Sequence, residues 1–252
     1  MRLQRSASGW LLVLNLLLPA AVAAQGGPPL RTDDPGTPGP GHWEINTALT
    51  IEKVPGQTAF EAPLADINYG IGERVQLKLE APLEVVDQHG ASAETRLGNP
   101  MVGVKWRFLD RVGTGFAVST YPQLELVGPS RTEAEREADG GESLLLPIEA
   151  VVRTGPVAWN AEVGYRMVAD APSAVIYGLV LGHDLTPWLE LAAECNGESD
   201  SRLEEATVVC SLGARESVNE HFTLLGALGR GISGPSEERP TMAMYLGLQS
   251  SW

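Results

Sequence analysis

The stretch Arg74-Val75-Gln76-Leu77-Lys78-Leu79-Glu80-Ala81-Pro82-Leu83 decides the fold of this chain. Its odd-numbered residues are apolar, whereas its even-numbered residues are polar or charged as far as Glu80. A β-strand with one apolar and one polar face requires this period of two, because successive side chains point to opposite sides. A helix would spread the same residues around its circumference.

The same alternation recurs along the chain and predicts about twelve strands. Each spans about nine to fourteen residues, which suits tilted membrane strands of about nine to eleven better than soluble strands of about five or six. We therefore expect an all-β fold, a single antiparallel transmembrane β-barrel. The expected strand ranges are 42–52, 60–69, 73–84, 100–109, 114–127, 143–153, 157–168, 173–183, 188–196, 205–215, 221–231 and 241–252.

The links between these ranges alternate in length, which is a second indication of a membrane barrel. Five are short, whereas the others are mostly longer and polar, and the longest covers 128–142. Outer-membrane barrels have short periplasmic turns and longer external loops. The link 169–172 is short for an external loop and fits this pattern poorly. The short links are 70–72, 110–113, 154–156, 184–187 and 216–220.

The N-terminal residues 1–24 have the features of a secretory signal peptide. Arg2 and Arg5 are followed by an apolar run from Trp10 to Leu18 and by small residues at 21–24. This pattern predicts export, with cleavage near Ala24. Residues 25–41 are rich in Pro and Gly and cannot form a helix or a central strand, so we expect a periplasmic leader that is extended. The barrel would then occupy residues 42–252.

The composition narrows the possible functions. The chain has 252 residues, of which 43% are hydrophobic and 20% charged, and its net charge is −14. These values exclude a disordered chain and make a nucleic-acid partner unexpected. No Gly-x-Ser-x-Gly or His-Glu-x-x-His motif is present, so we expect no enzymatic activity, no cofactor and no metal site.

The leader and the last strand resemble a known family. The run Leu30-Arg31-Thr32-Asp33-Asp34-Pro35-Gly36-Thr37 continues through Gly41 into the alternating residues after His42, and the last range reaches Trp252 on its apolar face. This opening resembles bacterial outer-membrane proteins that are often labelled transporters, one branch of which is named for the meta-pathway of phenol degradation. A last strand with a terminal aromatic residue is similar to the insertion signal of outer-membrane proteins. The resemblance implies an outer-membrane location, lipid and the barrel-assembly machinery as partners, and a hydrophobic or aromatic solute.

The polar strand faces would line the lumen and carry charges of both signs. Asp66 and Arg74 flank a tight turn and are close enough for a diagonal pair. Lys78, Lys105 and Arg107 lie on adjacent strands and could form a positive wall that attracts anionic solutes, unless neighbouring acids neutralise it. The lumen candidates are Asp66, Arg74, Lys78, Glu80, Lys105, Arg107, Glu125, Glu149, Glu162, Arg166 and Glu190.

Two further features concern the external side. Cys195 and Cys210 lie on consecutive strands at equal distances from the link between them, so they form either a disulfide or two buried thiols. Acidic residues gather in the expected external loops, either as divalent-cation sites or as solvated loops, although no spacing matches a calcium loop. Those acidic clusters are Glu133, Glu135, Glu137 and Asp139, then Glu198, Asp200, Glu204 and Glu205, then Glu237 and Glu238.

The sequence therefore predicts an outer-membrane channel or transporter for small solutes, but it does not name the solute. Two other classes stay open. One is a plugged barrel that has a structural or binding role without transport, since narrow barrels can be filled by their own side chains. The other is a soluble periplasmic β-protein, which would lack a lipid-facing belt.

Overall fold

The computed structural model describes residues 26–88, 92–130 and 141–252, so the predicted signal peptide lies outside the described residues. Within these ranges the chain forms fourteen strands and one short 3-10 helix, η1 (Val112–Thr114). The strands are β1 (Trp43–Val54), β2 (Gln57–Ile71), β3 (Val75–Gln88), β4 (Glu94–Leu97), β5 (Met101–Arg111), β6 (Phe116–Thr120), β7 (Gln123–Glu125), β8 (Ser143–Thr154), β9 (Val157–Val168), β10 (Ala174–Thr186), β11 (Leu189–Asp200), β12 (Ala206–Ser217), β13 (Phe222–Ser233) and β14 (Met242–Ser251).

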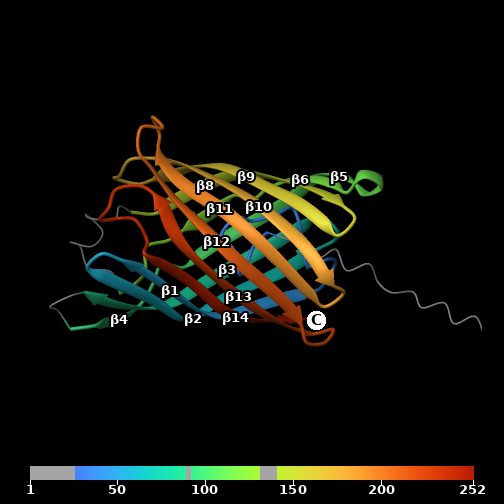
Figure 1. Cartoon of the computed structure of the whole chain (residues 1–252), viewed down its shortest axis with the longest axis horizontal. Helices are drawn as coiled ribbons and strands as arrows, with labels where there is room; N and C mark the ends of the chain where they lie inside the picture. Colours follow the sequence, from blue (N-terminus) through green and yellow to red (C-terminus); the bar gives the residue numbers. More distant parts are fainter. Residues whose placement is uncertain (1–25, 89–91, 131–140) are drawn as a thin grey trace, which may run out of the picture.

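The strands close into a barrel of twelve antiparallel positions, as the sequence predicts (Figure 1). β1 pairs with β14 from Glu44 opposite Ser251 to Lys53 opposite Met242, and this seam closes the sheet. β6 and β7 share one position between β5 and β8. β4 lies outside the ring and forms a hairpin with the end of β3. Closure leaves every barrel strand with two neighbours, which is the condition for a sheet in a solvent that cannot hydrogen-bond to its backbone.

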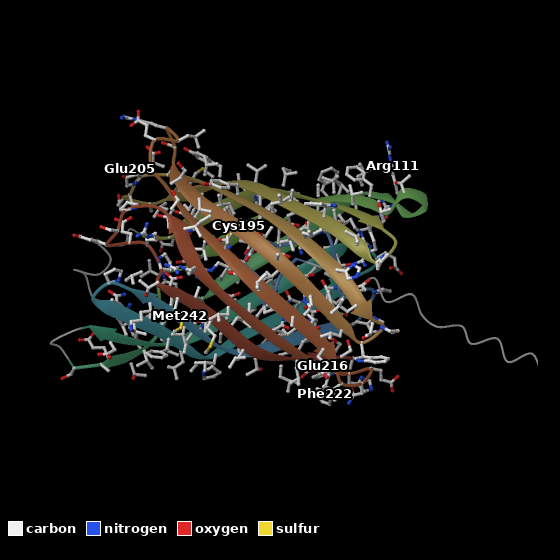
Figure 2. All side chains as sticks on the ribbon, in the orientation of Figure 1. Arg111, Cys195, Glu205, Glu216, Phe222 and Met242 are labelled. Atoms are coloured by element: carbon white, nitrogen blue, oxygen red, sulfur yellow. A yellow bond between two sulfur atoms is a disulfide. The ribbon has the colours of Figure 1, made fainter. Side chains whose placement is uncertain are left out.

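The two faces of the barrel wall differ as the period-two pattern predicts. Leu79 and Val104 point outward and are 46% and 48% exposed, whereas the neighbouring Lys105 points inward and is 2% exposed. Figure 2 shows side chains projecting from the outer wall along the length of the barrel. The outer belt is mainly Leu, Val, Trp and Phe, and the buried polar residues come from the opposite face of the same strands. This is the arrangement of a membrane barrel, in which the apolar face meets hydrocarbon.

The links also divide between the two ends. One end has short links at 72–74, 112–115, 155–156, 187–188 and 218–221, and the barrel termini Trp43 and Trp252 are hydrogen-bonded to each other at this same end. By the rule for outer-membrane barrels, we take this end as periplasmic. The opposite, external end carries residues 126–130 and 141–142 and the links 201–205 and 234–241. Figure 2 shows Glu205 at the external end and Glu216 at the periplasmic one.

Three local features differ from the sequence-based ranges. The first external link is a two-residue turn at Pro55 and Gly56, because the polar flanks that were predicted as a loop continue the two strands. Gly56 has a φ of 86°, which glycine adopts without strain. The predicted strand 114–127 is divided at Tyr121 and Pro122, and the separate β4 was not predicted. Among the described residues, no helix is long and apolar enough to cross a membrane.

Candidate functional site

The leader, residues 26–41, lies inside the barrel. At the periplasmic end the Gly41 amide donates to the Gly70 carbonyl at 2.9 Å, which fixes the leader to the end of β2. From there it extends to Arg31, whose guanidinium pairs with Glu52 toward the external end of β1. The chain then folds back, since the Gly27 amide donates to the Thr32 carbonyl at 2.7 Å.

This position corrects the expectation of an extended periplasmic arm. That expectation rested on the inability of a Pro- and Gly-rich segment to form a helix or a central strand. The segment indeed forms neither, but its backbone groups find partners in the barrel wall instead of water. The residues that hold it are far away in the sequence, so a local pattern does not reveal them.

Carboxylates of the wall accept hydrogen bonds from the leader backbone. Glu194 on β11 accepts from the Thr32 amide at 2.6 Å and from the Arg31 amide at 3.0 Å. Glu162 on β9 accepts from the Asp33 amide at 3.0 Å. These hydrogen bonds fix three consecutive leader residues, Arg31 to Asp33, to two strands of the wall.

Donors of the wall bind the leader carbonyls. The Arg215 guanidinium on β12 donates to the Pro28 carbonyl at 2.9 Å and to the Gly27 carbonyl at 3.0 Å. Arg215 also lies 3.5 Å from Glu190, which keeps the guanidinium within the lumen. The Asn160 side chain on β9 donates to the Asp33 carbonyl at 2.6 Å.

A buried ion pair links the leader to β5. The Lys105 Nζ atom lies 2.7 Å from the Asp33 carboxylate and 3.9 Å from that of Glu149, and it lies over the Tyr121 ring at 4.6 Å. Burial would raise the pKa of Asp33, but attraction from Lys105 and Lys78 outweighs burial and holds this pKa below its usual value. Asp33 is therefore an anion at neutral pH, and the leader is attached to the wall by charge.

A second network lies on β1, β2 and β3. The Lys78 Nζ atom is 2.8 Å from the Glu80 carboxylate and 3.7 Å from that of Asp66. Asp66 also accepts hydrogen bonds from the side chains of Asn46 and Asn68, at 3.1 and 3.0 Å. The network consists of wall residues alone, which distinguishes it from the contacts that depend on the leader.

The lumen is filled where the leader crosses it. Lys105 is 2% exposed, Glu149 0% and Asn160 1%, although all three carry polar groups on the inner face of the wall. An open aqueous pore would leave such side chains accessible to water. In this conformation the leader and the wall side chains together close the barrel at this level.

Seven of the eleven lumen candidates lie on the inner face in these networks: Asp66, Lys78, Glu80, Lys105, Glu149, Glu162 and Glu190. Arg166 pairs with Glu198 at 3.1 Å near the external end. Glu125 accepts a hydrogen bond from Asn99 at 2.7 Å. Arg107 lies near the periplasmic end, where it pairs with Asp110 at 3.3 Å.

One expectation about charge is wrong. Arg74 is an exposed residue of the turn 72–74 and does not pair with Asp66, whose cationic partner is Lys78 two residues into β3. Of the two alternatives for Lys78, Lys105 and Arg107, the structure has the neutralised one, since each of them has an acidic partner. The partner of Lys105 is Asp33 of the leader, and this pairing was not foreseen because the leader was expected outside the barrel.

The two cysteines lie on the outer face of the wall. Cys195 and Cys210 are directly opposite each other on β11 and β12 and form a disulfide. The bond therefore crosslinks a hairpin on the side that meets lipid, away from the leader.

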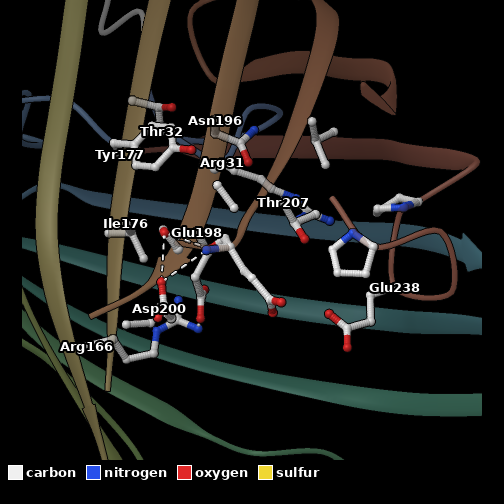
Figure 3. A pocket seen from close by; sticks show the side chains of 18 of the residues that line it. Arg31, Thr32, Arg166, Ile176, Tyr177, Asn196, Glu198, Asp200, Thr207 and Glu238 are labelled. Carbon is white, nitrogen blue, oxygen red and sulfur yellow. Dashed lines mark hydrogen bonds and ion pairs between the residues drawn. The ribbon is translucent and has the colours of Figure 1, made fainter. Parts of the chain in front are cut away.

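A cavity of about 540 Å³ lies on the external side of the leader (Figure 3). Its wall comes from β9 to β12 and from the link 234–241, and Arg31 and Thr32 of the leader form part of its lining. Half of the side chains that Figure 3 labels are charged: Arg31, Arg166, Glu198, Asp200 and Glu238. Among the residues that the structure describes, no group of three or more His, Cys, Asp or Glu side chains is arranged to hold a metal ion.

A closed antiparallel barrel with an apolar outer belt, a polar lumen and short turns at one end defines this chain as a β-barrel of the outer-membrane type. No protein-family model and no curated protein matches the sequence. Solved structures of outer-membrane channels share the fold. An outer membrane channel from Pseudomonas putida F1 has 12% identity and a TM-score of 0.60, over 84% of this chain and 96% of that one.

Two porins have similar scores. The NanC porin is 7% identical with a TM-score of 0.58, over 82% of this chain and 98% of that one. The KdgM porin, solved in complex with disordered oligogalacturonate, is 8% identical with a TM-score of 0.57, over 83% of this chain and 99% of that one. At such identities the likeness extends to the fold, and the phenol-degradation label stays a resemblance of the leader.

Proposed function

We propose that this protein is an outer-membrane channel for small solutes, and that the leader keeps it closed in the conformation described. One observation carries this proposal. Several polar groups of the lumen wall have their partners in a segment that lies outside the sheet, through Glu194, Glu162, Arg215 and Lys105. If the leader moves out, a polar passage remains, because these side chains lie on the inner face of a wall that needs no leader for its strand pairing.

Structures that are titled porins or channels share this fold, which supports the channel class over the soluble periplasmic class. The outer belt of exposed Leu, Val and Trp supports a location in a lipid bilayer. Lipid and the barrel-assembly machinery would then be the partners of the chain. We propose no catalysis and no cofactor. The proposal that the solute is hydrophobic or aromatic is based only on the resemblance of the leader to the family described above.

The competing function is a plugged barrel without transport, and the nearly inaccessible Lys105 and Glu149 favour it as long as the leader stays in place. Planar-bilayer conductance separates the two functions. We would compare refolded protein that begins at residue 25 with a variant that begins at residue 37. The channel proposal expects low conductance from the first and a larger, steady conductance from the second. A folded second protein that does not conduct would establish the plugged barrel.

A further inference from the structure

Glu149 on β8 is a buried acid whose hydrogen bonds are incomplete. Its Oε2 atom accepts from the Ser119 hydroxyl on β6 at 2.6 Å, whereas its Oε1 atom is buried and has no hydrogen-bond partner. The Lys105 Nζ atom lies 3.9 Å from Oε2, which is too far for a hydrogen bond. Buried polar groups are normally satisfied, so the conformation described does not use this carboxylate fully.

The close partners of Lys105 belong to the leader. Its ammonium group pairs with the Asp33 carboxylate at 2.7 Å and donates to the Asp34 carbonyl oxygen. Both contacts end together if the leader leaves the lumen. Lys105 would then remain on the inner face of β5 without them, and an uncompensated charge in a narrow barrel opposes the release of the leader.

Glu149 and Lys105 lie on neighbouring parts of the wall. Ser119 on β6 is directly opposite Glu149 on β8, and β6 also pairs with β5, the strand of Lys105. The leader takes no part in these strand pairings. A displacement of the Lys105 Nζ atom by about 1 Å would bring it within ordinary hydrogen-bond distance of Glu149. The flexible four-carbon stem of lysine allows such a movement.

We propose that Glu149 is a positioning residue that receives Lys105 when the leader leaves the lumen. Lys105 exchanges Asp33 for Glu149, so its ammonium group has a carboxylate partner in both the closed and the open barrel. The exchange lowers the free-energy difference between the two states, and it leaves an ion pair instead of a lone cation on the wall of the open passage. This inference rests on the proposed channel function, since it concerns how the leader is released.

The proposal predicts the sign of the effect when the Glu149 charge is removed. In the closed barrel Lys105 attracts Glu149, but the Asp33 carboxylate on the same ammonium group repels it, so the two effects oppose each other. In the open barrel Asp33 is gone and only the attraction remains. Loss of the charge therefore disfavours the open state more than the closed one. A carboxylate that merely supports the closed barrel would have the opposite effect.

Trypsin cleavage after Arg31 measures how often the leader is released. In refolded protein that begins at residue 25, we expect Glu149→Gln to slow this cleavage about twofold to fivefold. Glu125→Gln on β7 is the matched control, because that carboxylate accepts a hydrogen bond from Asn99 and lies outside the Lys105 network. It should leave the rate unchanged. Faster or unchanged cleavage in Glu149→Gln overturns the proposal.

A second measurement follows Lys105 itself. In the same protein with Asp33→Asn, Lys105 has lost its leader carboxylate and should pair with Glu149. Brief treatment with acetic anhydride, followed by mass spectrometry, gives its reactivity relative to Lys78, which pairs with Glu80. Pairing stabilises the protonated amine, which does not react with the anhydride. Adding Glu149→Gln should therefore raise the relative reactivity about threefold or more.

The control for this measurement is Glu162→Gln, added to Asp33→Asn in place of Glu149→Gln. Glu162 on β9 is directly opposite Glu149 and is an acid of the same type on the same inner face. We expect a smaller rise in Lys105 reactivity from it. An equal or larger rise with Glu162→Gln, or no rise with Glu149→Gln, means that Lys105 does not move to Glu149 and overturns the proposal.

These outcomes are independent of the conductance experiment. A protein that never conducts refutes transport, but the reactivity of Lys105 still shows whether the exchange of partners occurs. A protein that conducts after removal of the leader, but in which Glu149→Gln accelerates cleavage, keeps the channel and refutes the exchange.

Discussion

Thr32 of the leader lies against Gly178 of β10, so closely that a Cβ atom on residue 178 would be 2.0 Å from the Thr32 hydroxyl oxygen. The same atom would be 2.8 Å from the Thr32 methyl carbon and 2.9 Å from its Cβ atom. Rotation of the threonine side chain therefore does not relieve the contact. The leader can occupy the lumen because the wall has a glycine at this point.

Gly178→Ala should displace the leader and open the barrel. The added methyl group overlaps Thr32, whereas strand pairing of β10 does not depend on it. We expect a higher single-channel conductance than in the wild-type protein. Gly226→Ala is the matched control, since its Cβ atom would be 3.7 Å from Leu246, an ordinary contact. Wild-type conductance in Gly178→Ala would show that the leader adjusts without leaving.

Loss of either member of the Lys105–Asp33 pair should release the leader. Breaking a buried ion pair from one side costs about 3–5 kcal/mol, because it leaves an uncompensated charge. We expect Asp33→Asn and Lys105→Met each to raise the rate of trypsin cleavage after Arg31 by more than about tenfold. The double variant should be cleaved less than the product of the two effects predicts. Strictly multiplicative effects would mean that the two side chains are not coupled.

Leu79→Arg should destabilise the barrel through its outer face. Leu79 is 46% exposed on the outer wall, and arginine near the bilayer midplane of such barrels costs about 2–4 kcal/mol. Chemical unfolding in lipid vesicles measures the change in free energy. Leu203→Arg is the control, because Leu203 is 67% exposed in the link 201–205 at the external end. Equal stability of the two variants would contradict the membrane register.

Removal of the disulfide should lower stability and leave conductance unchanged. The bond closes a segment with a sequence separation of 15, for which the chain-entropy model gives about 3 kcal/mol. We expect Cys195→Ser/Cys210→Ser to unfold at lower urea concentration than the oxidised protein and to match the reduced wild type. Because both cysteines lie on the outer face, any change in conductance would count against the separation of wall and lumen.

The strands of this protein could be predicted because their two faces meet very different surroundings. Hydrocarbon on one side and polar groups on the other make the alternation in Val75–Gln88 visible in the sequence. The exact ends of the strands, which depend on how neighbouring strands pair, could not be predicted. Polar residues such as Lys53 and Thr58 suggested a loop, but they are paired with each other across β1 and β2. The division of the strand at Pro122 follows from the missing amide hydrogen of proline, yet its place was not evident in advance.

The lumen was partly predictable and the leader contacts were not. The inward positions of Lys78 and Lys105 follow from the period of two alone. The partners of the leader do not, because Asp33 meets Glu162 across 129 residues and Arg31 meets Glu194 across 163. The conspicuous Thr32-Asp33-Asp34 motif was the one local sign of a specific role. The Asp33 carboxylate and the Thr32 side chain meet the wall, whereas the Asp34 carboxylate accepts the leader amides of Gly26 and Gly36.

The glycine at 178 and the carboxylates that receive the leader amides have a consequence for how such a protein can vary. The membrane-spanning wall is specified by its strand pairing and its outer belt, whereas the lumen is filled by residues 26–41, a segment outside the sheet. In the proposed channel, a different leader would change which solutes pass through the lumen, but it would not change the fold of the barrel wall. For the proposed channel, the filling of the lumen is thus separate from the folding of the barrel wall.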